Sequence, residues 1–130
     1  MAGELEGLIQ DMFDGLAKKD VDAMLQESAT DVQGVDEISR RWIRGSEDLS
    51  AYIRQLAEMA DDVVSEMRDV HESTWGDTGL VTFWLEQDYT LNGERQHISA
   101  PTTAAFRREG GDWKLVLFHS IPLADDQQPA

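Results

Sequence analysis

The spacing of apolar residues changes near residue 60, and this change constrains the fold more than any other feature of the sequence. Before that point, apolar residues recur at intervals of three and four, which is the pattern of amphipathic helices. From Val63 onward, stretches rich in β-branched and aromatic residues alternate with glycine-containing turns, as is typical of β-strands. Helices followed by strands predict an α+β domain, with the helices on one face of an antiparallel sheet.

Three helices are expected in the first half of the chain. The apolar stripe of the first helix consists of Leu5, Leu8, Ile9, Met12, Phe13 and Leu16. Asp20 can cap a short second helix, because its side chain can accept a hydrogen bond from the first turn. Ser46 is the expected cap of the third helix, and Glu47 and Asp48 in its first turn suit the helix dipole.

Four strands are expected in the second half, joined by turns at 76–79, at Asn92-Gly93 and at 109–112. These strands are longer than the usual length of about five or six residues, so the sheet should twist and curl. Pro101 lies within the third of these strands and predicts a bend or a bulge there. The expected fold is therefore a curved antiparallel sheet folded over helices around a small pocket.

Turn geometry assigns side chains to the two faces of the sheet, because successive residues of a strand point to opposite sides. A two-residue turn at Asn92-Gly93 places Asp88 opposite His97, as a cross-strand ion pair. The next turn places Thr102 opposite His119, on the face that the helices cover. The other face mixes aromatic residues with charges and is expected to be a subunit interface, formed by Trp84, His71, Phe118 and His97.

Length and charge limit the domain organisation and the partners. The chain has 130 residues, and we expect a single domain over 1–130, with an ordered core at about 5–123 and a frayed tail at 124–130. The formal net charge is -15, and such a surface repels nucleic acids and anionic membranes, so neither is an expected partner. The sequence has no cysteine, no apolar run that could span a bilayer and no secretory signal, so a cytoplasmic location is expected.

The C-terminal hairpin resembles that of a known family. From Phe106 to Ser120 it reads FRREGGDWKLVLFHS, which is similar to the last hairpin of SnoaL-like domains in the nuclear-transport-factor-2-like, or ketosteroid-isomerase-like, superfamily. The helix order of the first half agrees, including the segment WIRGSEDL from Trp42 to Leu49 before the third helix. The resemblance covers roughly Leu5 to Leu123. It implies a cone with a pocket at its open end and, as in many members, a homodimer through the sheet.

The resemblance implies a pocket without a complete catalytic set. The isomerase branch uses a carboxylate base, with a tyrosine and a protonated acid as hydrogen-bond donors. The first helix offers Phe13 and Leu16 where the tyrosine belongs, and no carboxylate stands near Thr102 where the protonated acid belongs. Asp36 is left as a candidate base. Because the other two parts are missing, steroid-type isomerisation is not expected.

His119 and Asp36 are the candidate catalytic residues. A histidine in an apolar pocket can transfer protons near neutral pH, but His119 can equally be a core histidine hydrogen-bonded to a neighbour. Asp36 and Glu37 can line the mouth of the cone, or they can form a solvated acidic turn that faces Arg40 and Arg41. The expected pocket residues are Trp42, Tyr89, Thr102, Phe13 and Trp113. The histidines are far apart in the sequence, so no metal site and no cofactor are expected.

Two functions of different class fit these observations. One is a dimeric, non-catalytic binding or accessory protein with a pocket for an apolar small molecule. The alternative is a small isomerase, lyase or hydrolase that acts on an apolar substrate by acid–base chemistry. An enzyme of that kind needs Asp36 and His119 within reach of one substrate, so the positions of these two side chains discriminate between the hypotheses.

Overall fold

Three helices form the first half of the protein, as the periodicity predicts. The structure, a computed structural model, describes residues 3–124. The helices are α1 (Glu4–Lys18), α2 (Val21–Gln26) and α3 (Ser46–Met59). None of the helices in this described part of the chain has the length and apolar character needed to cross a membrane. The expected tail from residue 125 onward lies outside the described residues.

The starts of the two later helices follow local sequence signals, with one difference. The Asp20 carboxylate accepts a hydrogen bond from the Ala23 backbone N–H at 3.1 Å and caps α2 as predicted. The cap of α3 is Gly45 and not Ser46, because the backbone at residue 45 has a φ of 87°. Glycine adopts this left-handed conformation without strain, so it sets the direction in which α3 leaves the preceding strand.

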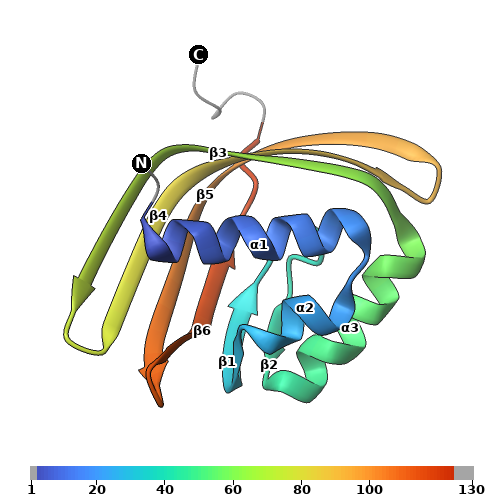
Figure 1. Ribbon diagram of the computed structural model, residues 1–130. Coiled ribbons are helices and arrows are strands. Elements are labelled where there is room, and N and C mark those ends of the chain that lie inside the picture. The colour runs from blue at the N-terminus through green and yellow to red at the C-terminus, as the bar shows by residue number, and fades with distance from the viewer. Residues whose placement is uncertain (1–2, 125–130) are drawn as a thin grey trace.

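Six strands form one curved sheet that arches over the helices (Figure 1). They are β1 (Ser28–Val35), β2 (Trp42–Arg44), β3 (Ala60–Trp75), β4 (Thr78–Leu91), β5 (Glu94–Glu109) and β6 (Asp112–Ser120). Their order in the sheet is β2-β1-β6-β5-β4-β3. Helix α1 runs beneath the arch of β3, β4 and β5, while α2 and α3 lie near β1 and β2 (Figure 1). The predicted fold class, an α+β cone, is confirmed.

The short strands β1 and β2 extend the sheet beyond the predicted meander. β1 pairs antiparallel with β2 but parallel with β6, so one pairing in this otherwise antiparallel sheet is parallel. Gly34 in β1 lies opposite Phe118 in β6, and a Cβ at residue 34 would approach the Phe118 carbonyl oxygen to 2.4 Å. Only glycine allows this approach, which holds the C-terminal end of β1 against β6.

The hairpin of β4 and β5 has the predicted register. Asp88 lies opposite His97, and the pairing continues without interruption through Pro101, so the bulge expected there is wrong. The Ser99 carbonyl accepts a hydrogen bond from the Leu123 N–H, beyond the end of β6. Backbone groups at alternate residues point the same way, so position 101 also faces the side where β6 has ended. The proline therefore removes no hydrogen bond from the ladder.

A bulge in β6 exchanges the faces of its last residues. The pairing of β5 with β6 shifts by one residue because Val116 is an extra residue on β6. Two predicted placements are wrong for this reason. His119 lies opposite Thr103 and is exposed on the outer face, whereas Phe118 points inward toward the core.

Strand β3 also departs from the predicted register. Its turn to β4 has two residues, Gly76 and Asp77, where the sequence predicts four, and His71 consequently lies opposite Thr82 and not Trp84. The pairing shifts at Asp62 and Asp69, which both have a φ of 53°. Aspartate tolerates this conformation better than most residues. These bulges increase the local twist and help the long strand to curve.

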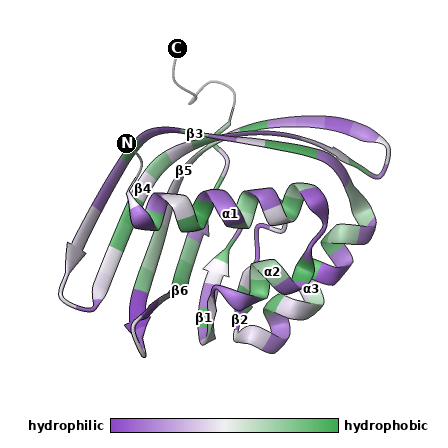
Figure 2. Ribbon diagram, in the orientation of Figure 1, coloured by the Kyte–Doolittle hydropathy of each residue, from purple (hydrophilic) through white to green (hydrophobic). Residues whose placement is uncertain are grey.

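The core lies between the inner face of the arch and the apolar faces of the helices. Buried and partly exposed residues alternate along β4, and Figure 2 shows hydrophobic and hydrophilic residues alternating along the long strands. One apolar cluster, which includes Ile9 and Phe106, lies under α1. A second, which includes Ile53 and Tyr89, lies against α3. The interior between these two clusters holds the candidate site.

Candidate functional site

A cavity of about 100 Å³ lies inside the cone, bounded by α1, α3, β1 and β6. Its wall is mostly apolar, and the residues that form much of it are Ile9, Phe13, Leu16, Ile53, Leu115 and Phe118. The rings of Phe13 and Phe118 meet edge to face, with their centroids 6.3 Å apart. An acidic cluster, which consists of Asp36, Glu37 and Tyr52, forms one part of the wall.

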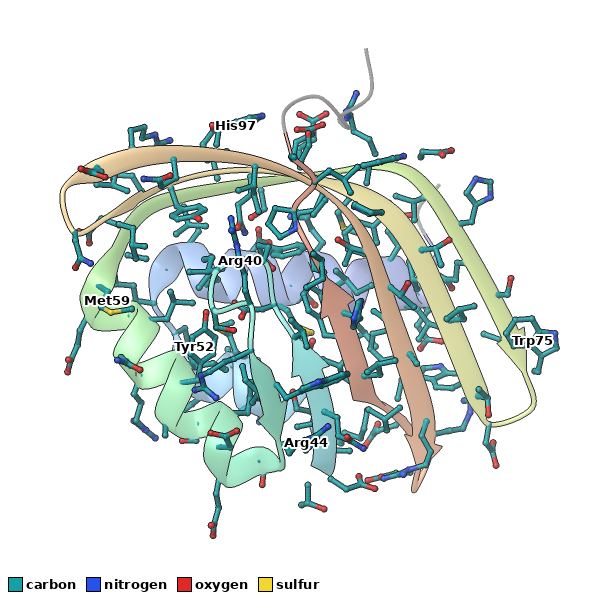
Figure 3. All side chains as sticks on the ribbon, turned by 180° about the vertical axis from the view of Figure 1, so that it is seen from behind. Arg40, Arg44, Tyr52, Met59, Trp75 and His97 are labelled. Atoms are coloured by element: carbon teal, nitrogen blue, oxygen red, sulfur yellow. The ribbon has the colours of Figure 1, made fainter. Side chains whose placement is uncertain are left out.

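Asp36 is held by the turn that follows β1. Its Oδ1 atom accepts hydrogen bonds from the Ser39 backbone N–H at 3.0 Å and from the Ser39 hydroxyl, a common way for aspartate to stabilise a turn. Its Oδ2 atom accepts a hydrogen bond from the Tyr52 hydroxyl at 2.5 Å. Tyr52 projects from α3 beneath the arch (Figure 3). Burial, followed by the charge of Asp36, raises the pKa of Tyr52, so this side chain is a neutral donor near pH 7.

Glu37 is the most unusual residue of the acidic cluster. Its side chain is buried, with an exposed fraction of 3 %, and its Oε2 atom has no hydrogen-bond partner among the described residues. Burial, followed by the negative charge of Asp36, raises the pKa of Glu37 to about 8. The carboxyl is therefore mostly protonated near pH 7 and can donate a hydrogen bond. The expected alternative of a solvated acidic turn is wrong for this residue.

Strand β4 supplies the polar neighbours of Glu37. The Gln87 amide is fully buried, donates from Nε2 to the Ser65 hydroxyl at 2.9 Å, and lies within hydrogen-bonding reach of the Glu37 carboxyl. Its Oε1 atom has no partner among the described residues. Burial, followed by the charge of Glu37, raises the pKa of Tyr89, which lies further along the same face. A protonated Glu37 suits this environment better than a carboxylate, because it adds a donor where acceptors are in excess.

Two of the seven residues predicted for the catalytic pair and the pocket line the cavity, namely Asp36 and Phe13. Three others are buried in the surrounding core. Tyr89 belongs to the apolar cluster against α3. The Thr102 hydroxyl forms a hydrogen bond of 2.8 Å with the Ser120 hydroxyl. Trp113 donates from Nε1 to the Glu4 carboxylate at 3.2 Å, under the N-terminal end of α1. The prediction that these three residues line the cavity is therefore wrong, although all three side chains are buried inside the protein.

Trp42 and His119 lie outside the cone. The predictions that Trp42 lines the pocket and that His119 acts within it are therefore wrong. Strand β2 turns Ile43 inward and Trp42 outward, so the Trp42 side chain is 49 % exposed. Its ring lies 6.1 Å from the exposed His119 ring, and the Arg44 guanidinium lies 4.8 Å from the Trp42 ring centroid. Asp36 and His119 are consequently on opposite sides of the sheet. The geometry does not form the catalytic pair that the acid–base hypothesis required.

The outer face of the sheet carries three of the four predicted interface residues. His71, Trp84 and His97 point outward, and in Figure 3 His97 lies outside the arch. Phe118 lines the cavity, so its assignment to this face is wrong. Within residues 3–124, no group of three or more histidine, aspartate or glutamate side chains is arranged to hold a metal ion.

Two carboxylates on this outer face, Glu86 and Asp88, lie beside basic side chains. His97 lies 2.8 Å from Asp88 through Nδ1 and 3.3 Å from Glu86 through Nε2. Glu86 also pairs with Arg68 and accepts a hydrogen bond from the Ser99 hydroxyl at 2.5 Å. Burial raises the pKa of Glu86, but the hydrogen bonds from Ser99 and Arg68 outweigh it and hold the pKa below its ordinary value.

Comparisons with known proteins agree with this geometry. The model of the SnoaL-like domain family matches residues 5–124. An NTF2-like protein from Streptomyces avermitilis, whose name suggests a dehydratase, has a TM-score of 0.83 at 18 % identity, over 93 % of this chain and 95 % of its own. An NTF2-like protein of unknown function from Pseudomonas putida has a TM-score of 0.79 at 21 % identity, over 98 % of this chain and 90 % of its own. A ketosteroid isomerase-like protein from Erwinia carotovora has a TM-score of 0.76 at 16 % identity, over 92 % of this chain and 93 % of its own. No curated protein matches the chain.

The α+β cone is therefore a fold that this chain shares with solved NTF2-like and ketosteroid isomerase-like structures. The family match spans almost the whole described chain, and the protein belongs to the SnoaL-like domain family. Identities of 16–21 % to the solved structures show a shared fold and not a shared reaction.

The sequence contains signals for residues that pattern reasoning missed. Gln87 falls on the inner face of β4, between Leu85 and Tyr89, and a polar residue at such a position requires a polar partner. Tyr52 lies on the buried stripe of α3, and its hydroxyl likewise requires one. Together they point to a polar site inside the cone. The burial of Glu37 depends on the conformation of a turn, which no periodicity specifies.

Proposed function

We propose that the protein binds a small, mainly apolar molecule in the cavity of its cone. The observation that carries this proposal is an apolar wall interrupted by one buried, unpartnered acceptor, the Oε2 atom of Glu37. A ligand would bury its apolar part against the wall and place one polar group beside Glu37, as is common at small-molecule sites. This function requires no catalysis.

The volume of the cavity limits the ligand. Pockets for drug-sized ligands enclose roughly 300–1,000 Å³, whereas this cavity encloses about 100 Å³. A molecule of roughly five to eight non-hydrogen atoms therefore fits without movement of the wall. Larger apolar ligands would require displacement of α1 or α3.

A titration with 1-butanol, followed by NMR, tests the binding function. We expect saturable shifts at cavity residues such as Phe13 and Ile53. Leu49, which lines the cavity and is half-buried, can be enlarged to fill it, so Leu49→Trp should abolish these shifts. The control is Leu117→Trp on the outer face, which should bind as the wild type does. Absence of saturable shifts at the cavity residues of the wild type would refute the proposal.

Acid–base catalysis is a second candidate, favoured by one specific observation. Asp36 accepts a hydrogen bond from Tyr52 and lies beside Glu37, whose pKa is raised to about 8, so the cluster holds neighbouring carboxyl groups in different environments. In this case Asp36 is the base and Glu37 the acid, with no part for His119. Deuterium exchange at the α-carbon of butanone is the measurement. Catalysis by the wild type that is lost in both Asp36→Asn and Glu37→Gln would support an enzyme, and equal rates with and without protein would exclude this reaction.

We also propose a homodimer through the outer face, in the cytoplasm. Trp84 and His71 among charged residues support the interface, and the absence of cysteine supports the location. Sedimentation velocity is the test. Trp84→Arg should shift the protein toward the monomer, while Trp75→Arg at the exposed tip of the β3–β4 hairpin should not. A wild-type protein that stays monomeric at high concentration would contradict the dimer.

A further inference from the structure

The acidic cluster forms no ion pair with the part of the protein that the structure describes. Asp36 and Glu37 are adjacent, and neither forms an ion pair within 4.0 Å with any described residue. Glu37 is buried, lines the cavity and has an unpartnered oxygen. Buried carboxylates in proteins are normally paired with a cation or are neutralised by protonation. The cavity therefore presents the negative charge of Asp36 and, beside it, a carboxyl oxygen of Glu37 without a hydrogen-bond partner.

Neither nearby arginine forms an ion pair with the acidic cluster within residues 3–124. The Arg41 guanidinium lies 5.6 Å from the centroid of the Tyr52 ring and 3.7 Å from the Asp48 carboxylate. Arg40 is exposed, and its positive charge acts on Tyr89. Neither arginine is among the groups that shift the pKa of Glu37. The turn that carries Asp36 and Glu37 thus provides no positive charge in contact with them.

The polar groups that reach the cluster from α3 and β4 are neutral. From α3 the cluster receives the Tyr52 hydroxyl, and from β4 the Gln87 amide and, further along, the Tyr89 ring. Strand β3 contributes the Ser65 hydroxyl, through Gln87. Each of these groups can adjust a hydrogen bond, but none can balance a negative charge. A cation in the cavity would pair with these carboxyl groups, which no cationic side chain of residues 3–124 does.

We propose that the ligand of the cavity is a small aliphatic amine, bound as its ammonium ion beside the Oε2 atom of Glu37. This inference rests on the proposed binding function and specifies the class of its ligand. The ammonium group would donate to Glu37 and lie in the field of Asp36, while the alkyl chain would contact the apolar wall. The formal net charge of -15 favours the approach of cations over anions.

Proton release distinguishes an amine from a neutral ligand. The amine enters as the ammonium ion, and Glu37 ionises as the pair forms, so its proton passes to the solvent. No other bond is made or broken. Binding near pH 7 should therefore release up to one proton, and the affinity should increase with pH, by at most about tenfold per unit, until the pKa of Glu37 is passed.

Three probes of matched size provide the test: n-butylamine, 1-butanol and butyrate. Calorimetry in buffers of different ionisation enthalpy measures both affinity and proton release. We expect butylamine to bind roughly tenfold more tightly than 1-butanol near pH 8, as for one charge-assisted hydrogen bond, and butyrate not to bind. Glu37→Gln should remove the preference for the amine and the proton release, and should retain binding of 1-butanol. Glu66→Gln, on the exposed outer face, is the matched control and should change neither.

The outcomes separate this inference from the binding function on which it rests. Equal binding of amine and alcohol by the wild type, or an amine preference that persists in Glu37→Gln, overturns the amine while leaving the binding function in place. Failure of all three probes to bind overturns both. If Glu37→Gln does not fold, carbon NMR of the wild-type Glu37 carboxyl decides the matter. Butylamine must then lower the Glu37 pKa, and an unchanged value refutes the proposal.

Discussion

The inner and outer faces of the sheet hold carboxyl groups in opposite surroundings. Inside the cone, Glu37 is buried without a cation, and burial followed by the charge of Asp36 raises its pKa to about 8. Outside, burial also raises the pKa of Glu86, but hydrogen bonds from Ser99 and Arg68 outweigh it and the pKa is lowered. The same type of side chain is therefore a proton donor on one face and half of an ion pair on the other.

This difference shows which face can respond to a ligand. Glu86 and Asp88 on the outer face already have partners, so a new cation there would only replace one pairing with another, at the small gain typical of exposed sites. The inner carboxyl has no charged partner and is shielded from water. A ligand that reaches it can change its protonation, and with it the stability of the cone.

The largest expected effect comes from truncating the inner face. Phe106 is 1 % exposed and belongs to the cluster under α1, so Phe106→Ala should lower the free energy of unfolding by roughly 3–5 kcal/mol. Its neighbour Arg107 points outward and its ion pairs face solvent, so Arg107→Ala should cost far less than Phe106→Ala. Urea denaturation measures both. Similar costs for the two variants would mean that the alternation between faces is wrong in this part of β5.

The second-largest expected effect is that of Glu37→Gln on the free energy of unfolding, and this substitution should stabilise the protein. Because its pKa is raised from 4.5 to about 8 by folding, the folded protein binds more protons than the unfolded chain between these pH values. The contribution of Glu37 to stability is complete below pH 4.5 and is lost as the pH rises through about 8. Glu37→Gln mimics the protonated carboxyl, so it should stabilise the protein by roughly 2–4 kcal/mol near pH 8 and have little effect near pH 4.5.

Urea denaturation across this pH range is the measurement for Glu37→Gln, with Glu66→Gln as the exposed control. The wild type should lose stability as the pH rises, whereas the Gln variant should not. Parallel pH profiles for the wild type and Glu37→Gln would show that Glu37 is ionised within the fold, and would remove the contrast between the two faces.

The fold could be predicted because its signals are local. The apolar stripe of α1, the Asp20 cap and the Asn92-Gly93 turn each depend on a few neighbouring residues, and the structure contains all three. Errors arose where one extra residue alters a long pairing. Val116 shifts the end of β6 and carries His119 to the outer face, and nothing in the local sequence marks it as a bulge.

The candidate site was only partly predictable for a related reason. Asp36 directly follows the last residue of β1, and the sequence already suggested it as a residue of the cone's mouth. Glu37 lies in the turn beyond the strand, where the period of two no longer applies. Its polar neighbour Gln87 is 50 positions away in the sequence. A contact of that kind becomes visible only when the whole sheet has formed.

The smallest expected effect is that of Glu86, and its sign is opposite to that of Glu37. The folded protein holds the pKa of Glu86 below its ordinary value of 4.5, so its contribution to stability is present above that pH and is lost as the pH falls through the lowered pKa. Glu86→Gln should therefore destabilise the protein near pH 7, by about 1 kcal/mol or less because the ion pairs face solvent.

Urea denaturation of Glu86→Gln from pH 7 downward, with added salt as a second variable, completes the comparison. The difference from the wild type should shrink as the solution is acidified, and it should also shrink in high salt, which screens the exposed pairs with Arg68 and His97. The effect of Glu37→Gln should depend little on salt, because the Glu37 carboxyl is shielded inside the cone. A Glu86 effect that is insensitive to salt, or a Glu37 effect that salt removes, would mean that the two carboxyl groups experience similar surroundings after all.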